Sequence, residues 1–453
     1  MSAVLLVFPE TRYKNGQVPL GLAYCAASLE QRGHEAVILD LVHTPRPLAT
    51  LERLLRSRRF DMVGISVVTT HLTLASQVSG IVRTLAPEAA IVWGGAHPTV
   101  MPEETAARPE VDIVVIGEGE VVLAALADDP ARRDLPGLAF RRGSSVVNTG
   151  PPVPIEDLDA LPFPARHLVP MESYLRYWYS LDAVSPRMRG TGIIASRGCP
   201  YRCSFCQPTL ARLFGRKVRK RSPGNVVTEL EHLRRTYRIE GFMFEDSTFV
   251  LDRPWVLAVC DALRGLRLTW CCNIRADLVD EGLLASMAEA GLRKVNIGIE
   301  SGVQRILDEA YQKQITTDDV NRVVAWCRKL DIKVQGYFIL GVPIETKDEM
   351  RETLRYAMRL DIDDAVFDIA TPFPETHMYA KWHQYVTADF AQFDCFHKSV
   401  FRNLHGVSPG WVERQKRLAY YRFYLHPRRW RYTARMLMTP TGVGRTLMKA
   451  RRV

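Results

Sequence analysis

Three cysteines stand within eight residues in the stretch IIASRGCPYRCSFCQP, residues 193–208. Cys199, Cys203 and Cys206 are spaced C-x3-C-x2-C and directly follow a short apolar run. Closely spaced thiolates can hold a metal centre. A structural zinc site normally closes on four ligands, so zinc would have to recruit its fourth ligand from elsewhere in the chain. A [4Fe–4S] cluster held by three cysteines leaves one iron open to an exogenous ligand, which explains why three thiols suffice.

The cysteines follow the first of six apolar runs that alternate with helical stretches. Ser222 and Pro223 provide a helix start, as N-cap and first helical residue. Six strand–helix units predict a partial (βα)6 TIM barrel, with its chemistry at the carboxyl ends of the strands. Cys271 and Cys272 lie on the third strand, so one should point inward and one outward, as ordinary buried residues. The runs, within residues 191–376, are IIAS, GFMFED, WCCNIRA, KVNIGIE, KVQGYFILG and DAVFDIAT.

The cysteine motif resembles that of the radical S-adenosylmethionine superfamily, because an aromatic residue, Phe205, precedes the third cysteine after the first strand. The resemblance implies a [4Fe–4S] cluster on Cys199, Cys203 and Cys206. It also implies that S-adenosylmethionine (SAM) binds the open iron and is cleaved to a 5′-deoxyadenosyl radical, which abstracts hydrogen from carbon.

The same resemblance implies SAM-binding roles for residues that follow the barrel strands. Phe205 would pack near the adenine. The stretch FEDSTF, residues 244–249, would bind the methionine amino group, although it is not the Gly-Gly-Glu version of this motif. Arg275 would pair with the methionine carboxylate or hold the surroundings of the cluster. The full set of implied SAM-binding residues is Phe205, Glu245, Asp246, Arg275, Glu300 and Ser301.

Residues 1–150 carry a second alternating series, with five apolar runs separated by amphipathic helices. This pattern predicts a doubly wound α/β domain with a parallel sheet, which binds ligands beyond the carboxyl ends of its strands. Neither a G-x-x-x-x-G-K-[ST] motif nor a G-x-G-x-x-G motif after the first strand is present, so a phosphate-binding loop is not indicated. The runs are VLLVFP, AVILD, MVGISVV, AAIVWGG and DIVVIGE.

Three stretches of this domain resemble the cobalamin-binding domain of cobalamin-dependent radical SAM enzymes. They are residues 19–40, GGAHPT at 94–99 and VDIVVIGEGE at 111–120. The glycines would let the wide corrin ring approach the backbone. The D-x-H-x-x-G loop is absent, which implies that no histidine coordinates cobalt; His97 would shape its loop or touch the corrin edge. The implied cobalamin-binding residues are Pro9, Ser66, Thr69, Thr70, Gly94, Gly95, His97, Thr99, Gly117, Glu118 and Gly119.

The positive charge is concentrated at the C-terminus. Residues 411–453 contain twelve Lys or Arg and one Glu, so the net charge of this segment alone is larger than the +10 of the whole chain. Helical spacing predicts one apolar face from Leu418, Tyr421, Tyr424 and Leu425, with arginines beside it. This mostly helical region would cap the open barrel, lie on an anionic membrane surface or hold an anionic substrate. Nothing resembles a nucleic-acid reading motif, so no nucleic-acid partner is expected.

These patterns predict four segments: a cobalamin-binding domain at 1–150, a proline-rich linker at 151–190, the radical SAM barrel at 191–376 and the basic region at 377–453. The chain opens without a signal peptide, its longest uncharged window contains polar residues, and its nine cysteines form no disulfide framework, which predicts a cytoplasmic protein. An external electron donor of the flavodoxin or ferredoxin type is expected to reduce the cluster.

Three functions are compatible with these features. The first is a methyltransferase acting on an unactivated carbon of a small molecule of the natural-product or lipid-like type. The basic region is compatible with an anionic substrate. The second is a cyclase or ring-rearranging or oxidising enzyme that uses the same cofactors, since FYLHPRRW resembles the branch that includes the anaerobic magnesium-protoporphyrin cyclase and hopanoid-modifying enzymes. The third is a cobalamin or redox sensor. A sensor would be expected to carry a signalling or DNA-binding module, and the sequence shows none.

Overall fold

The computed structural model describes residues 1–10 and 14–450 and divides into two compact units. Unit 1 comprises Met1–Tyr174, Pro208–Arg219 and Phe390–Gln392. Unit 2 comprises Leu175–Gln207, Lys220–Asp389 and Phe393–Val453. The segment predicted as a linker is therefore shared between the two units, and most of the basic C-terminal region packs within the barrel unit.

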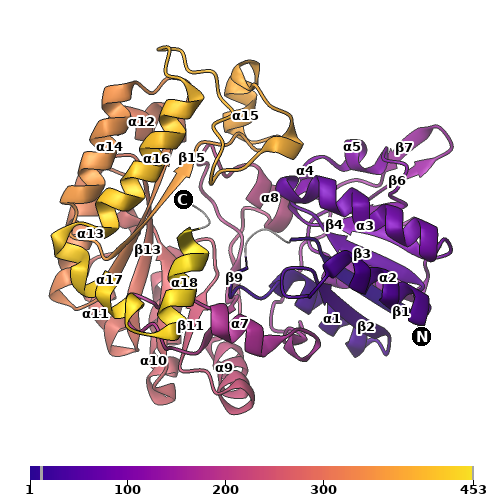
Figure 1. The fold of residues 1–453 in the computed structure, drawn as a ribbon. Helices are drawn as coiled ribbons and strands as arrows, with labels where there is room; N and C mark the ends of the chain where they lie inside the picture. Colours follow the sequence, from indigo (N-terminus) through magenta and orange to yellow (C-terminus); the bar gives the residue numbers. More distant parts are fainter. Residues whose placement is uncertain (11–13, 451–453) are drawn as a thin grey trace. The chain divides into compact units, whose positions relative to one another are not determined.

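Unit 1 contains a sheet with the strand order β2-β1-β3-β4-β5-β6-β7, shown in indigo to magenta in Figure 1. The first five strands are parallel, which confirms the predicted doubly wound fold. The antiparallel hairpin β6–β7 extends the sheet and was not indicated by the apolar runs. The strands are β1 Ala3–Phe8, β2 Glu35–Asp40, β3 Met62–Ser66, β4 Ala90–Gly94, β5 Ile113–Val115, β6 Leu138–Arg142 and β7 Ser145–Asn148. The helices are α1 Leu20–Gln31, α2 Pro47–Ser57, α3 Leu72–Leu85, α4 Ala96–Val100, α5 Pro102–Ala106, α6 Glu120–Asp128 and α8 Thr209–Phe214.

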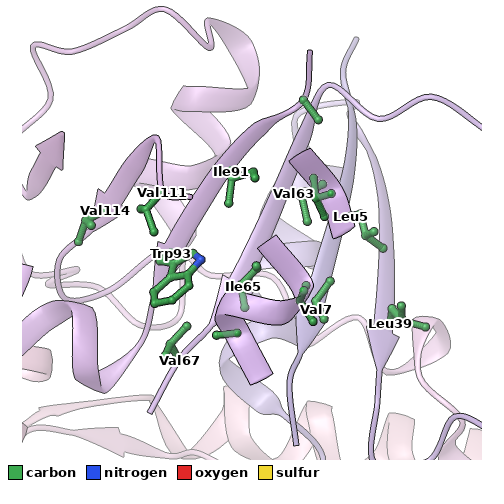
Figure 2. Packing of buried hydrophobic residues seen from close by; sticks show 14 of the residues in the cluster. Leu5, Val7, Leu39, Val63, Ile65, Val67, Ile91, Trp93, Val111 and Val114 are labelled. Carbon is green, nitrogen blue, oxygen red and sulfur yellow. The ribbon is translucent and has the colours of Figure 1, made fainter. Parts of the chain in front are cut away.

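The two faces of this sheet form two separate apolar cores. Side chains at alternate positions, such as Leu5, Val7 and Ile65, pack on one face with Trp93 (Figure 2). Their neighbours in sequence, such as Leu6, pack on the other face. Each fully buried aliphatic side chain contributes roughly 1.5–3 kcal/mol. Because both faces are covered, the strands read as continuous apolar runs, as parallel strands usually do.

Unit 2 contains a six-stranded parallel sheet with the order β15-β14-β13-β12-β11-β8. This curled sheet is the predicted partial barrel, although its first strand begins earlier than the run IIAS. Ser222 accepts a hydrogen bond from Asn225 N and caps α9, as predicted. The strands are β8 Gly190–Ile193, β11 Gly241–Phe244, β12 Thr269–Ile274, β13 Leu292–Glu300, β14 Lys333–Leu340 and β15 Asp364–Ile369. The helices are α9 Pro223–Tyr237, α10 Arg253–Leu263, α11 Glu281–Glu289, α12 Gln304–Ile306, α13 Thr317–Lys329 and α14 Lys347–Arg359, while α7 Met171–Tyr177 precedes the first strand.

The C-terminal helices belong to unit 2 and cover part of its sheet. They are α15 His377–Trp382, α16 Pro409–Tyr424, α17 Trp430–Leu437 and α18 Pro440–Ala450. Helix α16 lies along the edge strand β15, where the Tyr420 hydroxyl accepts a hydrogen bond of 3.1 Å from Phe367 N (Figure 1). Covering an edge strand satisfies its free backbone groups and prevents unwanted pairing. The structure therefore agrees with the prediction that this region caps the open barrel.

The predicted apolar face of α16 is wrong. Tyr421 and Leu425 are 58% and 65% exposed, whereas Val412, Ala419 and Phe423 are buried. The edge strand determines which face of the helix is buried, because the ring of Phe367 packs against Tyr420 and Phe423. None of the helices in the described residues combines the length and the apolar character needed to cross a bilayer.

Candidate active site

The cysteine loop lies beyond the carboxyl end of β8 and is anchored on both sides. Ser204 N donates to Tyr311 O at 2.9 Å, and Met378 N donates to Ser204 O at 2.9 Å. His377 N donates to Gln207 O at 2.8 Å, at the start of α15. Cys199 is buried, whereas Cys203 and Cys206 are partly buried. The loop is therefore held by backbone bonds from two distant segments of unit 2.

The surroundings of the thiols balance burial against positive charge. Burial raises the pKa of Cys203, and burial together with the neighbouring thiols raises the pKa of Cys206 to about 12. The cations Lys313 and Arg275 act in the opposite direction on Cys203, because they stabilise a thiolate. Thiolates are the form that binds metal, so cations beside the loop favour a metal centre.

Arg275 contacts the cysteine loop directly from the end of β12. Its Nη1 donates to Cys203 Sγ at 3.7 Å, and its guanidinium carbon lies 3.5 Å from the centre of the Tyr201 ring. Asp277 accepts from Nε and Nη2 at 3.1 Å each, and Lys313 O accepts from Nη2 at 2.7 Å. The side chain is therefore fixed by a carboxylate, a carbonyl and an aromatic ring.

Lys313 forms a second charged contact beside the loop. Its Nζ lies 2.5 Å from Glu300 Oε1 and 5.9 Å from the centre of the Phe205 ring. Gly298 leaves room for it, since an added Cβ there would lie 2.2 Å from Lys313 Nζ. The two aromatic residues of the loop are therefore each faced by a cation that a carboxylate holds.

The backbone around this ion pair is unusually strained. Glu300 has φ 65°, and Gln312 and Gln314, on either side of Lys313, have φ 50° and 58°. A π-helix, Leu307–Tyr311, comes directly before them. Left-handed non-glycine residues and π-helices cluster at functional sites, because the surrounding structure must offset their cost of about 1–3 kcal/mol each.

Glu245 and Asp246 point to opposite sides of the chain where β11 ends. Asp246 is 1% exposed and its Oδ2 accepts from Ala195 N at 3.2 Å, so it fixes the segment that leads to the cysteine loop. Glu245 lies against Gly192 of the neighbouring strand on the inner face of the sheet. Burial and the adjacent Asp246 raise the pKa of Glu245 to about 7, and burial raises the pKa of Asp246 to about 6. Glu245 Oε1 and Asp246 Oδ1 are buried without a hydrogen-bond partner in the described residues.

A polar layer crosses the inner face of the sheet at the level of Glu245. Asn273, Asn296, Gln335 and Asp364 are register partners on four neighbouring strands. Asn296 Nδ2 donates to Asn273 Oδ1 at 3.2 Å, while Asn296 Oδ1 is buried with no partner in the described part of the chain. Barrel interiors are usually filled by bulky aliphatic residues. A layer of amides with an unpaired buried oxygen is therefore suited to a ligand rather than to packing alone.

Cys271 lies on the inner face and Cys272 on the outer face of β12, as the alternation predicted. Cys271 Sγ donates to Ser180 O at 3.8 Å within a small apolar cluster that includes Trp178. Both cysteines are fully buried. Among the described residues, neither cysteine forms a hydrogen bond with the cysteine loop, so both fit an ordinary packing role.

The six residues predicted to bind SAM do not all meet at one point. Phe205 belongs to the cysteine loop, Arg275 contacts Cys203, and Glu300 holds the Lys313 that faces Phe205. Glu245 lies on the inner face of the sheet. Ser301 is fully buried, and its Oγ is 2.9 Å from Thr353 Oγ1, so it shapes the turn after β13. Sequence reasoning missed Lys313, Asp277 and the ring of Tyr201. Only Tyr201 carried a signal, as the other aromatic residue within the cysteine motif.

The residues around the loop fit an iron–sulfur cluster by their chemistry. Three thiols from one loop, two buried cations and unpaired carboxylate oxygens nearby suit a cluster with an open iron that takes a ligand bearing hydrogen-bond donors. No group of three or more metal-ligating side chains is arranged as a ready-made metal site among the described residues. The fit therefore rests on the donor set and its electrostatic surroundings.

The predicted cobalamin-binding residues gather at the carboxyl edge of the unit 1 sheet. The strand order reverses between β1 and β3. Pro9 lies just beyond β1, and Ser66 is the last residue of β3. Ligands of doubly wound sheets bind at such a reversal point. Thr70 is exposed and Ser66, Gly94 and Gly95 are partly exposed, so these positions offer a surface at this edge.

His97 is fully buried and serves its own loop. Its Nδ1 is 3.2 Å from Thr69 Oγ1 and its Nε2 is 3.2 Å from Glu104 Oε2. Thr99 acts similarly, since its Oγ1 accepts from Gly117 N at 2.9 Å. Of the two roles predicted for His97, shaping the loop matches the structure. With both ring nitrogens engaged, the imidazole has no lone pair to offer to cobalt.

Two of the other predicted positions are occupied by contacts within unit 1. Glu118 is buried and its Oε2 lies 2.7 Å from Arg219 Nη1. Gly95 has φ 100°, and a Cβ there would lie 2.9 Å from Val67 O, so its lack of a side chain serves the fold of the loop. The predicted reason for glycine, approach of the corrin to the backbone, is therefore not needed to explain this position.

Comparison with known proteins places these observations in one family. The family model described as the B12 binding domain matches residues 11–127, and the Radical SAM superfamily model matches residues 193–357. An uncharacterised methyltransferase of Pyrococcus horikoshii is 31% identical over 94% of this chain and 93% of its own. The cytidylyl-2-hydroxyethylphosphonate methyltransferase of Streptomyces wedmorensis is 30% identical over 78% of this chain and 76% of its own.

Two further similarities concern a cyclase and a solved structure with a similar fold. The anaerobic magnesium-protoporphyrin IX monomethyl ester cyclase of Cereibacter sphaeroides is 28% identical over 86% of this chain and 65% of its own. The radical SAM methyltransferase TsrM of Kitasatospora setae, solved with cobalamin and a [4Fe–4S] cluster, has a TM-score of 0.71 and 24% identity, covering 92% of this chain and 82% of its own. The chain belongs to the B12-binding radical SAM family, and it is an enzyme of that family.

Proposed function

We propose that this protein is a cobalamin-dependent radical SAM methyltransferase that methylates a carbon atom of a small molecule. The observation that carries the proposal is the combination, in one chain, of a B12-binding sheet and a three-cysteine barrel, with a methyltransferase relative that matches 94% of this chain. When bound, the cluster and SAM supply a carbon-centred radical and the cobalamin supplies a methyl group; this chemistry belongs to the cofactors.

The residues of this chain would hold and orient these groups. Cys199, Cys203 and Cys206 would ligate the cluster, and Phe205 would lie beside SAM. The edge of the unit 1 sheet, with Ser66, Thr70, Gly94 and Gly95, would hold the cobalamin. His97, Thr69, Thr99 and Glu118 would support this edge through the contacts they make within unit 1.

We propose a polar small-molecule substrate that presents hydrogen-bond donors to the inner face of the barrel. Support comes from Glu245 Oε1 and Asn296 Oδ1, two buried acceptor atoms without partners in the described residues. A buried acceptor left unpaired costs about 1–3 kcal/mol, and a hydroxyl or amine of the substrate would remove that cost. A wholly apolar lipid would not.

The basic C-terminal region is proposed to serve structure first. Arg445 is 2% exposed and paired with Asp182 at 2.7 Å, and Arg429 is also buried, so neither is available to an anionic substrate or membrane. Peripheral membrane contact would have to use the exposed apolar side chains of the C-terminal helices, such as Tyr421, Trp430 and Leu447. An external low-potential electron donor and a cytoplasmic location remain part of the proposal, and nine free cysteines support the location.

The test begins with anaerobic reconstitution of the full chain with iron, sulfide and hydroxocobalamin. Under a low-potential reductant, SAM should yield both 5′-deoxyadenosine and S-adenosylhomocysteine. Cys203→Ala should abolish deoxyadenosine formation, whereas Cys260→Ala, a buried cysteine of α10, should retain it. Labelled methyl can then be followed into cell extracts to find the acceptor. Deoxyadenosine without S-adenosylhomocysteine would favour the cyclase-type reaction that some relatives carry out.

A further inference from the structure

We propose that Arg275 is a positioning residue for the iron–sulfur cluster: it holds Cys203 by a charged hydrogen bond and thereby raises the reduction potential of the cluster. Arg275 Nη1 donates to Cys203 Sγ at 3.7 Å, which is within the range of hydrogen bonds to sulfur. The inference rests on the cluster in the proposed function. It does not depend on methyl transfer or on the identity of the substrate.

The guanidinium group is held in one orientation by three different contacts. Asp277 takes two N–H groups at 3.1 Å each, Lys313 O takes a third at 2.7 Å, and the ring of Tyr201 lies 3.5 Å from the guanidinium carbon. Arg275 is 4% exposed. An arginine fork is planar and always charged, so a site built around its shape fixes its direction in a way that lysine cannot reproduce.

The count of donors separates this role from binding of a carboxylate. An arginine side chain has five N–H groups. Asp277, Lys313 O and Cys203 use four of them, which leaves one. Bidentate recognition of a carboxylate needs two parallel N–H groups. Of the two roles that the sequence suggested for Arg275, holding the surroundings of the cluster is the one that the geometry favours.

The effect on the cluster follows from electrostatics. One-electron reduction adds a negative charge to the cluster and its thiolates. Hydrogen bonds to the sulfurs and a nearby cation stabilise that added charge, and burial strengthens the effect because the local dielectric is low. Lys313 contributes a second cation, but Glu300 neutralises it at 2.5 Å. Asp277, the partner of Arg275, is more exposed than Glu300, so it balances the guanidinium charge less completely than Glu300 balances the charge of Lys313.

The experiment measures the reduction potential rather than turnover. Full-length protein is reconstituted with iron and sulfide, without SAM, cobalamin or substrate, and the reduced cluster is followed by EPR during a redox titration. At the potential where the wild-type cluster is half reduced, Arg275→Met should lower the ratio of reduced to oxidised cluster at least tenfold, a shift of about 59 mV. The reduction potential of Arg275→Lys should lie between those of the wild type and Arg275→Met.

Three further variants sharpen the result. Tyr201→Phe keeps the aromatic ring but removes a hydroxyl that interacts with Arg275, so it should change the potential less than Arg275→Met does. Asp277→Asn removes the carboxylate charge that partly balances the guanidinium, while its amide oxygen can still accept an N–H, so the potential should rise with full iron content. Arg253→Met is the matched control, because Arg253 forms an exposed pair with Asp280 at 2.7 Å in the same unit. It should match the wild type.

The outcomes distinguish this inference from the proposed function. Arg275→Met with full iron content and a wild-type potential would overturn the inference alone. If Arg275→Met retains no iron, Arg275→Lys and Asp277→Asn decide, and wild-type potentials in both would overturn it. A wild-type protein that takes up no cluster at all would overturn both the inference and the proposed function.

Discussion

Glu245 illustrates how a single side chain prepares the inner face of the barrel. Gly192 on the neighbouring strand leaves space for it, since an added Cβ would lie 2.7 Å from Glu245 Cγ. Burial and the adjacent Asp246 raise its pKa from 4.5 to about 7. Ionisation of this carboxyl therefore costs free energy in the ligand-free folded protein. A substrate or cofactor group that donates a hydrogen bond to Oε1 would offset this cost.

The first prediction concerns the pH dependence of stability in the ligand-free protein. Because the pKa of Glu245 is higher in the folded state, the unfolded chain releases this proton first. Glu245 therefore makes the free energy of unfolding fall as pH rises from about 4.5 to about 7. Glu245→Gln removes this dependence, so the variant should gain stability over the wild type, on the order of 3 kcal/mol at pH 8.

Thermal unfolding of both proteins at pH 5 and pH 8 checks this prediction. The difference in Tm between variant and wild type should be small at pH 5 and should increase in favour of the variant at pH 8. A difference that is the same at both pH values would show that Glu245 is not the group that titrates.

The positions of the site residues, as distinct from their roles, were predictable only where a motif carried them. The three cysteines and Phe205 could be placed from spacing, and the alternation of β12 correctly separated Cys271 from Cys272. Lys313 could not be predicted. It follows a π-helix, and the residues on both sides of it, Gln312 and Gln314, have left-handed backbone conformations. Neither feature leaves a pattern in the sequence. Ser301 matched a motif position, yet its hydroxyl bonds to Thr353.

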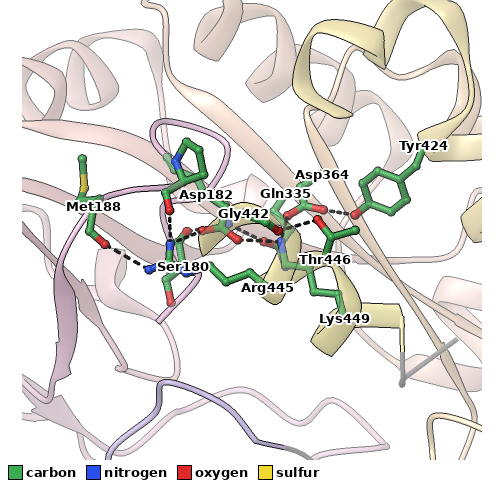
Figure 3. A network of polar contacts seen from close by, with 12 residues as sticks. Ser180, Asp182, Met188, Gln335, Asp364, Tyr424, Gly442, Arg445, Thr446 and Lys449 are labelled. Atoms are coloured by element: carbon green, nitrogen blue, oxygen red, sulfur yellow. Dashed lines mark hydrogen bonds and ion pairs between the residues drawn. The ribbon is translucent and has the colours of Figure 1, made fainter. Parts of the chain in front are cut away.

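At the scale of elements, α18 closes one end of the barrel with charged groups instead of apolar ones. Arg445 donates to Asp182 Oδ1 at 2.7 Å and to Pro186 O at 2.9 Å, and Lys449 lies between Asp182 and Asp364 at 3.3 and 3.6 Å (Figure 3). A buried ion pair contributes little net stability, but removing one partner leaves a buried charge and is costly.

The second prediction follows from this buried pair. Arg445→Met should lower the free energy of unfolding by about 3–5 kcal/mol, because Asp182 then loses its partner at 2.7 Å and keeps the more distant Lys449 at 3.3 Å. Asp182→Asn combined with Arg445→Met should cost less than the sum of the two single changes, since the uncompensated charge is gone. Arg253→Met, in an exposed pair, should cost at most about 1 kcal/mol. Anaerobic denaturation of the four variants measures these costs, and strictly additive costs at the two buried positions would contradict the prediction.

The elements themselves were largely predictable, because both sheets are parallel and their strands read as apolar runs. The buried face of α16 was not, because helical periodicity identifies candidate faces without naming the partner. Tyr420 and Phe423 face inward to meet Phe367, an outward-pointing residue of a strand that lies more than fifty positions earlier. The hairpin β6–β7 was missed for a related reason, since its short strands carry exposed charges such as Arg141 and Arg142.

At the scale of the whole molecule, the chain contains two compact units, each with its own core and its own set of site residues. The cysteine loop and its cations lie in unit 2, whereas the edge at β1 and β3 lies in unit 1. Within unit 1, Gly95 fixes the loop between β4 and α4, because its φ of 100° suits glycine and an added Cβ would approach Val67 O to 2.9 Å.

The last prediction is that the two cofactors can be lost independently. Gly95→Val forces a β-branched residue into a left-handed conformation beside Val67 O, so it should distort the loop and reduce bound cobalamin several-fold while the iron content stays unchanged. Cys203→Ala should do the reverse. Gly80→Ala in α3, where an added Cβ meets no neighbouring atom, is the control and should retain both. Iron, sulfide and corrin are quantified on the same purified samples, and loss of iron in Gly95→Val together with loss of corrin in Cys203→Ala would instead mean that neither unit holds its cofactor without the other.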